Sequence, residues 1–551
     1  MRAMTMKKAI STTQLLLATM VAMALLLTAT AHAAAPGITG TTFNLTAQPA
    51  YLNQPDGQAV YSWGYGCASA PTGFAPAAIT NAVCNTMQVP GPTLIVTAPA
   101  SGTTTVTVNL TNGLPAAAGN TSILFPGFQV ATSGGVAGLL TQEAAPGGTV
   151  TYTLTIPSAA AGTHAYYSGT QGDLQVEMGL YGAIIVIPAT ANIPAACAAG
   201  LPLTNPGANS AAQLAAGESD FRLAAAAYNH PQACYDREYL FQFSEMDPNI
   251  HTQALAQVTA KATCTAGAAG CSLNVPTEPY HPAYFLINGR SMPDDMDPNY
   301  LAAYPHQPYN GNPHMHPGEL TLIRVIGQGR WQHPFHEHGN HVRILGRDGN
   351  LILSQTDPTS LAGPLFFTTT TTPGLAFDGI FYWTAKGLNW DAYGHNPASL
   401  DTNAKLPCTP DANGYNTGAP TAINYFEWCQ DHEKPVQAAP FGDVAGGGPV
   451  TLPDPNLFTN GAWYGGSPYL GPNATLRATG CSAGSPANSC GATGSTPPSG
   501  TIANSPSGEA GFAFMWHSHN EREITTNNIF PGGMLMMMLV DSREFLIDES
   551  N

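Results

Sequence analysis

The stretch TTTVTVNLTN, residues 103–112, alternates polar and apolar side chains and is rich in β-branched residues. A period of two places the apolar residues on one face of an extended strand, so this stretch predicts a half-buried β-strand. TVTYTLTI (149–156) and YGAIIVI (181–187) have the same character and are bounded by turn-forming residues. Short strands separated by turns favour a β-sandwich or barrel over a parallel sheet.

A second β-rich region begins near REYLFQFSEMD (237–247) and continues to FDGIFYW (377–383). The chain then passes into segments rich in Gly, Pro, Asn and Cys, and it returns to strand-like sequence in AGFAFMWHSH (510–519). The sequence therefore predicts an all-β protein with two domains joined by a linker. The expected bounds are 34–190 for domain 1, 191–232 for the linker, 233–551 for domain 2, and about 386–508 for a loop-rich insertion within domain 2.

The N-terminal residues 1–33 have the features of a signal peptide. Basic residues precede a short apolar core, and Ala31-His32-Ala33 provides a small-residue cleavage pattern. No later stretch has the ~20 apolar residues of a membrane span. We expect an exported protein located in the periplasm or outside the cell.

The overall charge argues against some partners. Only 9% of residues are charged, and 34 acidic residues face 17 basic ones, for a formal net charge of −17. This balance disfavours nucleic acids and anionic membranes as partners, and it is compatible with cationic substrates or metal ions. The expected partners are a metal ion and a small reducing substrate. A homo-oligomer is compatible with the sequence but is not indicated by it.

The ten cysteines form five sequence-neighbour pairs, and disulfides are the default in an exported protein. Nearest-neighbour pairing is our expectation, although sequence alone does not fix the connectivity. The expected pairs are Cys67–Cys84, Cys197–Cys234, Cys264–Cys271, Cys408–Cys429 and Cys481–Cys490.

The strongest chemical signal is HPFHEHGNH, residues 333–341. His336 and His338 lie two residues apart, so on a strand both imidazoles point to the same face. A second such pair, His517 and His519, occurs in another strand-like stretch. Two adjacent strands would bring four imidazoles to one point, and imidazole suits copper, with zinc as the alternative. Satisfied surface or core histidines are the competing interpretation.

At these residues the sequence resembles the multicopper oxidases, which are built from cupredoxin domains. HPFHEHG is similar to the third histidine motif of that family and WHSH (516–519) to its fourth. VPGPTLIV (89–96) and GLYGAIIV (179–186) are similar to its first-domain framework. The resemblance implies two cupredoxin-like Greek-key β-sandwich domains and a copper cluster held by four HxH pairs.

The sequence departs from that pattern in the first domain. Where the first histidine pair is expected, Leu124 and Pro126 stand instead. Tyr167 and Gly169 occupy the positions of the second pair, and the nearby His164 falls on the opposite strand face. Only His336, His338, His517 and His519 remain of the ligand set that the resemblance implies.

The mononuclear copper site of the family departs further. By resemblance His333 matches its first histidine, but Ser518 replaces the cysteine and Glu523 the second histidine. Serine cannot supply the thiolate that this site needs, so a laccase-type electron relay is not expected. His333 stays in the predicted metal set as a fifth ligand. The Met534 and Met536–Met538 run is expected to be core rather than ligand.

Other polar groups near the histidines leave alternatives open. Glu337, Glu521 and Glu523 are either metal ligands, acceptors that orient imidazoles, or solvated surface carboxylates. His314 and His316 form a further HxH that is either a surface metal site or an accident of a loop.

Three functions follow from these observations. The first is an exported copper-binding protein with a reduced histidine site and no electron relay. The second is an active oxidoreductase of the multicopper oxidase type that oxidises metal ions or phenols with oxygen. The third is a metal-free extracellular scaffold, with the insertion as its recognition surface. No catalytic residue is assigned.

Overall fold

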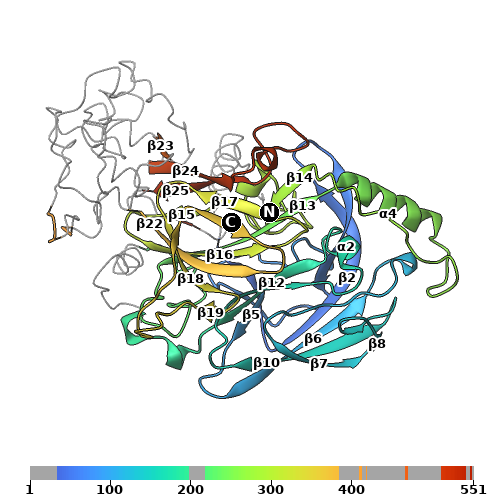
Figure 1. Cartoon of the computed structure of the whole chain (residues 1–551), viewed down its shortest axis with the longest axis horizontal. Helices are drawn as coiled ribbons and strands as arrows, with labels where there is room; N and C mark the ends of the chain where they lie inside the picture. The colour runs from blue at the N-terminus through green and yellow to red at the C-terminus, as the bar shows by residue number, and fades with distance from the viewer. Residues whose placement is uncertain are drawn as a thin grey trace, which may run out of the picture.

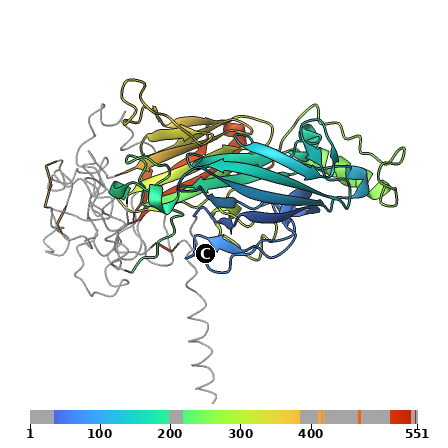
Figure 2. The same ribbon diagram turned by 90° about the horizontal axis from the view of Figure 1, so that it is seen from below.

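The computed structural model describes residues 34–197, 217–383, 409–412, 417–418, 466–469, 511–541 and 547–548. The expected all-β class is confirmed, because the strands build two β-sandwiches that lie side by side (Figures 1 and 2). The expected signal peptide, part of the linker and nearly all of the insertion lie outside the described residues. None of the helices in the described part of the chain is long and apolar enough to span a bilayer.

The first sandwich consists of two five-stranded sheets. One contains, in spatial order, β11 (Gly162–Tyr167), β12 (Tyr181–Ile187), β5 (Leu94–Thr97), β1 (Gly37–Thr39) and β4 (Gly73–Ala75). The other contains β3 (Ala59–Cys67), β2 (Thr42–Asn53), β6 (Thr103–Asn112), β10 (Thr149–Pro157) and β7 (Gln129–Gly134). A small hairpin of β8 (Val136–Ala137) and β9 (Gln142–Glu143) lies beside them.

Alternation along β6 and β10 builds the core of this sandwich. Val106, Val108 and Leu110 of β6 are fully buried, while the residues between them are partly exposed. β10 pairs antiparallel with β6 and buries its own alternate residues, among them Tyr152 and Leu154. Each such side chain contributes about 1.5–3 kcal/mol by leaving water. The half-buried strands expected at residues 103–112 and 149–156 are therefore confirmed.

The second sandwich has one larger and one smaller sheet. The larger contains β14 (Tyr284–Ile287), β13 (Arg237–Met246), β16 (Leu320–Gly327), β22 (Ala376–Tyr382), β18 (Val342–Arg347), β19 (Asn350–Leu351) and, paired with β18, β20 (Leu365–Phe366). The smaller contains β15 (His314–Met315), β25 (Leu535–Asp541), β24 (Gly511–Ser518), β17 (His333–Glu337), β21 (Thr368–Thr371) and, beside β24, β23 (Gly466–Tyr469).

Aromatic side chains fill the space between these two sheets. The Trp516 ring of β24 packs edge-on against Phe335 and Phe381, with ring centroids 6.0 and 4.9 Å away. Met534, Met536 and Met538 are fully buried in the same core, as expected for most of the methionine run. Close packing on their core-facing side therefore holds β17 and β24 in position.

The two sandwiches share a buried interface. Apolar residues of β11 and β12 pack against Leu240, Ile326 and Ala376 of the second sandwich. Asp378 of β22 accepts hydrogen bonds from the Thr163 hydroxyl of β11, at 2.5 Å, and from the Tyr228 hydroxyl, at 2.6 Å. The contact is therefore both apolar and charged.

Helices are few in the described residues. α2 (Gly172–Gln175) and the 3-10 turns η1 (Ala116–Ala118), η2 (Thr190–Asn192), η3 (Ala195–Cys197), η4 (Asp294–Met296) and η7 (Glu521–Ile524) are short. The longer α4 (Pro248–Ala260) was not expected from the sequence. Its start follows ordinary capping rules, because the Asp247 side chain accepts a hydrogen bond from the Asn249 amide and Pro248 occupies the first turn.

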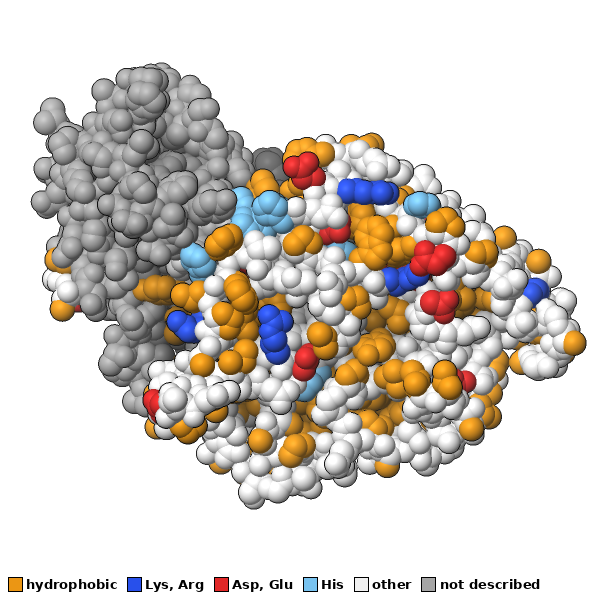
Figure 3. Space-filling model, in the orientation of Figure 1, with side chains coloured by type: hydrophobic (Ala, Val, Ile, Leu, Met, Phe, Trp, Pro, Cys, Tyr) orange, Lys and Arg blue, Asp and Glu red, His pale blue; other side chains and the backbone are white. Residues whose placement is uncertain are grey.

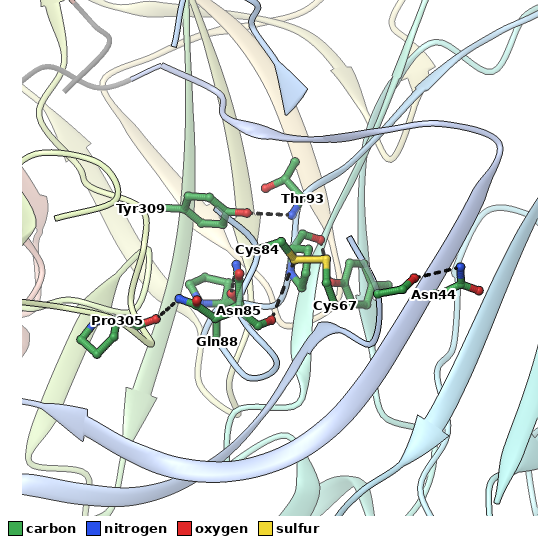
Figure 4. Close-up of a disulfide and its surroundings, with 12 residues drawn as sticks. Asn44, Cys67, Cys84, Asn85, Gln88, Thr93, Pro305 and Tyr309 are labelled. Carbon is green, nitrogen blue, oxygen red and sulfur yellow. Dashed lines mark hydrogen bonds between the residues drawn. A yellow bond between two sulfur atoms is a disulfide. The ribbon is translucent and has the colours of Figure 1, made fainter. Parts of the chain in front are cut away.

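Three of the five expected disulfides are present: Cys67–Cys84, Cys197–Cys234 and Cys264–Cys271. The other two expected pairs include residues outside the described part of the chain. Figure 4 shows the Cys67–Cys84 bond beside a contact between the sandwiches, where the Tyr309 hydroxyl accepts a hydrogen bond from the Thr93 amide. Disulfides of this kind are typical of oxidising compartments.

Candidate metal centre

β17 and β24 are adjacent antiparallel strands, and His336 lies directly opposite His517. Outside the regular ladder, the His519 amide donates to the Pro334 carbonyl and the His338 amide to the Met515 carbonyl. Phe335 and Trp516 belong to the core, so the residues that alternate with them face outward. All four predicted histidines therefore occupy one face, and histidine side chains gather over this part of the sandwich in Figure 3.

The four imidazoles are close together. The His336 ring lies 4.7 Å from the His338 ring and 4.8 Å from the His519 ring, measured between centroids. The Nε2 atoms of His338 and His517 are 3.2 Å apart. Ligand nitrogens of His336, His338 and His517 lie within 4.8 Å of one another. One small cation could contact several of these nitrogens at once.

Hydrogen bonds fix the rings. The Nδ1 atom of His517 lies 2.6 Å from the Ser518 carbonyl oxygen, which can only accept. Nδ1 therefore carries the proton, and Nε2 of the neutral ring carries the lone pair that points toward His338. Nδ1 of His336 lies 2.7 Å from the Thr368 hydroxyl. Such contacts set ring orientation in metal-binding histidines.

Electrostatics favour the neutral form of His336 and His517. Burial, together with the neighbouring His338, His517 and His519, lowers the pKa of His336 to about 4. Burial also lowers the pKa of His517. Because a protonated imidazole cannot bind a metal, the lowered pKa values leave these nitrogens available at neutral pH.

The comparison with protein families matches part of the first sandwich and does not extend to the four histidines. Residues 74–191, which span most of the first sandwich, match the family described as multicopper oxidase. This match supports the resemblance to the multicopper oxidases that the sequence motifs indicated. No curated protein sequence matches the chain.

Solved structures of multicopper oxidases are similar to the chain at low identity. The blue copper oxidase from Nitrosomonas europaea is 14% identical, with 90% of this chain and 85% of that chain covered and a TM-score of 0.40. The multicopper oxidase mgLAC is 14% identical, with coverage of 92% and 88% and a TM-score of 0.42. The laccase from Botrytis aclada is 18% identical, with coverage of 63% and 47% and a TM-score of 0.35.

The three residues at the expected mononuclear position of a multicopper oxidase come together in the structure. His333 Nδ1 lies 2.9 Å from Glu523 Oε2, and the Ser518 hydroxyl donates to the same oxygen. The other ring nitrogen, Nε2, lies 2.9 Å from Glu245 Oε2 of β13. All four side chains are buried. A hydrogen-bonded network of charges thus fills this position.

The network does not fit copper. Burial alone would lower the pKa of His333, but hydrogen bonds to Glu245 and Glu523, and their charges, outweigh it and raise the pKa to about 9. At neutral pH His333 is an imidazolium whose two N–H groups both point at carboxylates, and it has no lone pair for a metal. His333 therefore lies apart from the four-histidine group with which the sequence placed it.

The first-domain positions do not fit a copper cluster either. Leu124 forms a β-bridge with Tyr167, and these two residues and Gly169 line a cavity of about 300 Å³. The residues that line it carry no imidazole and no charge. His164 is buried on the other face of β11, with its ring 4.5 Å from that of Phe128, and its pKa is lowered by burial. Its expected separation from the ligand positions agrees with the strand register.

The glutamates near the histidines divide into three environments. Glu337 is fully buried on the core face, where burial raises its pKa well above the usual value. Glu523 belongs to the His333 network, and Glu521 is exposed. Of these three glutamates, only Glu521 is the solvated surface carboxylate that the sequence left as one alternative.

Of the two interpretations of His314 and His316, the surface metal site is wrong in its location, because both residues are fully buried. His316 Nε2 lies 2.9 Å from Glu218, and His314 Nδ1 lies 2.5 Å from Asp541. Arg237 also contacts Glu218, and its Nε donates to Glu319 at 2.6 Å. The group is a compact ion network in which Arg237 pairs with two of the carboxylates, Glu218 and Glu319.

Sequence reasoning missed Glu245, because its strand is hydrophobic and far from the histidine motifs in the sequence. It also missed Thr368, the first residue of the edge strand β21, which lies opposite His336. Neither position carries a motif. Period-two alternation along 535–541, by contrast, would have separated Met537 from Met536 and Met538.

Proposed function

We propose that this protein is an exported copper-binding protein that holds copper at His336, His338, His517 and His519 and has no laccase-type electron relay. The observation that carries the proposal is the opposition of His336 and His517 across β17 and β24, with both HxH pairs on one face. The 3.2 Å separation of the His338 and His517 Nε2 atoms supports it. A metal ion would replace the single proton that these two nitrogens share.

The donor set favours copper. Neutral imidazole suits copper, which also leads the affinity order of the divalent first-row metals. When bound, copper would supply a redox-active centre at the surface of the second sandwich. This chain's own residues would orient the rings through Thr368 and the Ser518 carbonyl.

The charged network at His333 supports the second half of the proposal. Electron transfer to a copper cluster in this family depends on a cysteine thiolate between the two histidines, and Ser518 holds a hydrogen bond to Glu523 there instead. Export is supported by the three disulfides and by the N-terminal sequence. A small reducing substrate and self-association stay open to experiment.

Copper stoichiometry tests the proposal. The purified protein is titrated with copper(II) and the bound metal is measured by mass spectrometry after desalting. We expect about one equivalent of copper and no intense blue absorption. His336→Ala and His519→Ala should each weaken binding at least about 100-fold, because each removes a direct ligand.

His281→Ala is the matched control, since His281 is an exposed histidine outside the group and its loss should leave binding unchanged. An intense blue thiolate band would contradict our reading of Ser518. A folded wild-type protein that takes up no copper would favour the scaffold function, and oxygen consumption with phenols or metal ions would restore the oxidase function. Uptake of zinc in place of copper would change the metal assignment.

A further inference from the structure

Two methionine side chains continue the histidine face onto the next strand. β24 pairs antiparallel with β25, and in this ladder His517 lies opposite Leu535 and Met515 opposite Met537. Alternation places Met515 on the same face of β24 as His517 and His519. Met537 occupies the corresponding face of β25.

Burial separates these two methionines from the others. Met534, Met536 and Met538 are fully buried in the aromatic core, whereas Met515 and Met537 are only half-buried. The methionines of β25 therefore point to two different faces: Met536 and Met538 to the core, and Met537 to the outer face. Packing accounts for the three core methionines, but it does not require a thioether at the two outer positions.

The outer methionines lie in line with His338. The His338 amide donates to the Met515 carbonyl at 3.3 Å, which makes Met515 its neighbour across the strand pair. A row therefore runs over three strands, from His338 through Met515 to Met537. Directly opposed residues have Cβ atoms about 4.5–5.5 Å apart, so the Met515 thioether is within reach of both the His338 imidazole and the Met537 thioether.

We propose that this row is a copper(I) site, in which the thioethers of Met515 and Met537 join the imidazoles of His338 and His517. The inference rests on the proposed copper function and specifies the oxidation state that the site prefers. Thioether sulfur is a soft ligand that selects copper(I), while imidazole serves both oxidation states. The site thus favours the reduced ion more than four histidines alone would.

Competition for copper(I) tests the inference. The full-length protein competes anaerobically with the chromophoric chelator bicinchoninate, and ascorbate is the reductant because it spares the disulfides. The double variant Met515→Leu and Met537→Leu keeps side-chain volume and removes both sulfurs. We expect copper(I) affinity to fall at least about 10-fold and copper(II) affinity to stay within about 2-fold. X-ray absorption of the copper(I) form should show sulfur scattering in the wild type only.

Met538→Leu is the matched control, since it makes the same change at a buried core position and should leave copper(I) affinity unchanged. Equal copper(I) affinities of wild type and double variant, with normal copper(II) binding, would overturn the copper(I) site and leave the proposed function standing. A wild-type protein that binds neither ion would overturn both. An equal loss of both affinities in the double variant would also count against a preference for copper(I).

Discussion

His333 and His336 stand three residues apart in β17, yet their pKa values move in opposite directions. Burial and three neighbouring imidazoles lower the pKa of His336 to about 4. His333 lies on the other face, where two glutamates overcome the effect of burial and raise its pKa to about 9. One face of the strand therefore carries a neutral imidazole at neutral pH, and the other carries a fixed positive charge. The chemistry of each histidine depends on its face and not on its motif.

His333→Gln should destabilise the protein by about 3–5 kcal/mol at pH 7, because it leaves two buried carboxylates without their cation. The raised pKa gives the sign of the pH dependence. The stabilisation by His333 is fully present below its ordinary pKa of 6.5 and is lost as pH rises through about 9. Urea unfolding between pH 6 and 10 measures both effects.

The variant should lack the loss of stability that the wild type shows near pH 9. His281→Gln, a change at an exposed histidine, is the control and should keep the wild-type profile. A wild-type stability that does not change between pH 7 and 10 would mean that His333 is neutral in the folded protein.

At the scale of the elements, ion pairs and hydrogen bonds hold the end of the C-terminal strand β25 in place. Asp541 closes the strand and binds His314, and the carbonyl of Asp541 lies 2.8 Å from His316 Nδ1. Glu218 reaches the same network from a segment ahead of β13 and accepts a hydrogen bond from the Ile547 amide at 3.0 Å. The network thus links β25, and the methionines on it, to β15 and, through Glu218 and Arg237, to β13.

Glu218→Gln should destabilise the protein by about 3–5 kcal/mol, because Arg237 would lose one of its buried partners. Burial alone would raise the pKa of Glu218, but Arg237 and His316 lower it below the usual value of 4.5. The stabilisation is therefore present above pH 4.5 and is lost as pH falls below it. Acid unfolding followed by circular dichroism measures this, with the more exposed Asp220→Asn as the control, expected to change stability by about 0–1 kcal/mol.

Sequence periodicity predicted the strands and the common face of each HxH pair. Those predictions depend on neighbours in the chain, and the alternation of side chains makes them secure. The pairing of β17 with β24, and the approach of Glu245 to His333, depend on contacts between distant segments that no local pattern encodes. The sequence therefore predicted the four-histidine group but placed His333 within it, because the motif does not show which face its neighbours cover.

At the scale of the whole molecule, the two sandwiches are joined by buried charge as well as by apolar contact. Arg324 of β16 pairs with Glu238 at 2.9 Å and donates to the Thr163 hydroxyl of the first sandwich at 3.1 Å. Thr163 in turn donates to Asp378. The Thr163 hydroxyl, on strand β11 of the first sandwich, therefore contacts both Arg324 and Asp378 of the second.

Thr163→Val should cost about 1.5–3 kcal/mol, because it removes a hydroxyl bonded to charged groups and keeps the side-chain shape. Calorimetry should show a lower unfolding temperature. Thr105→Val makes the same change at an exposed position of β6 and should stay within about 0.5 kcal/mol of the wild type. Equal effects of the two substitutions would show that Thr163 does not couple the sandwiches.

The direct opposition of His336 and His517 also determines where the chain can change length. A single residue added inside β17 or β24 would turn the histidines beyond it toward the aromatic core. A connection between two strands has no such restriction in general, since doubling the length of a loop costs only about 0.6 kcal/mol in closure entropy. Changes of length are therefore tolerated better between strands than within them, and the ladder keeps His336 opposite His517.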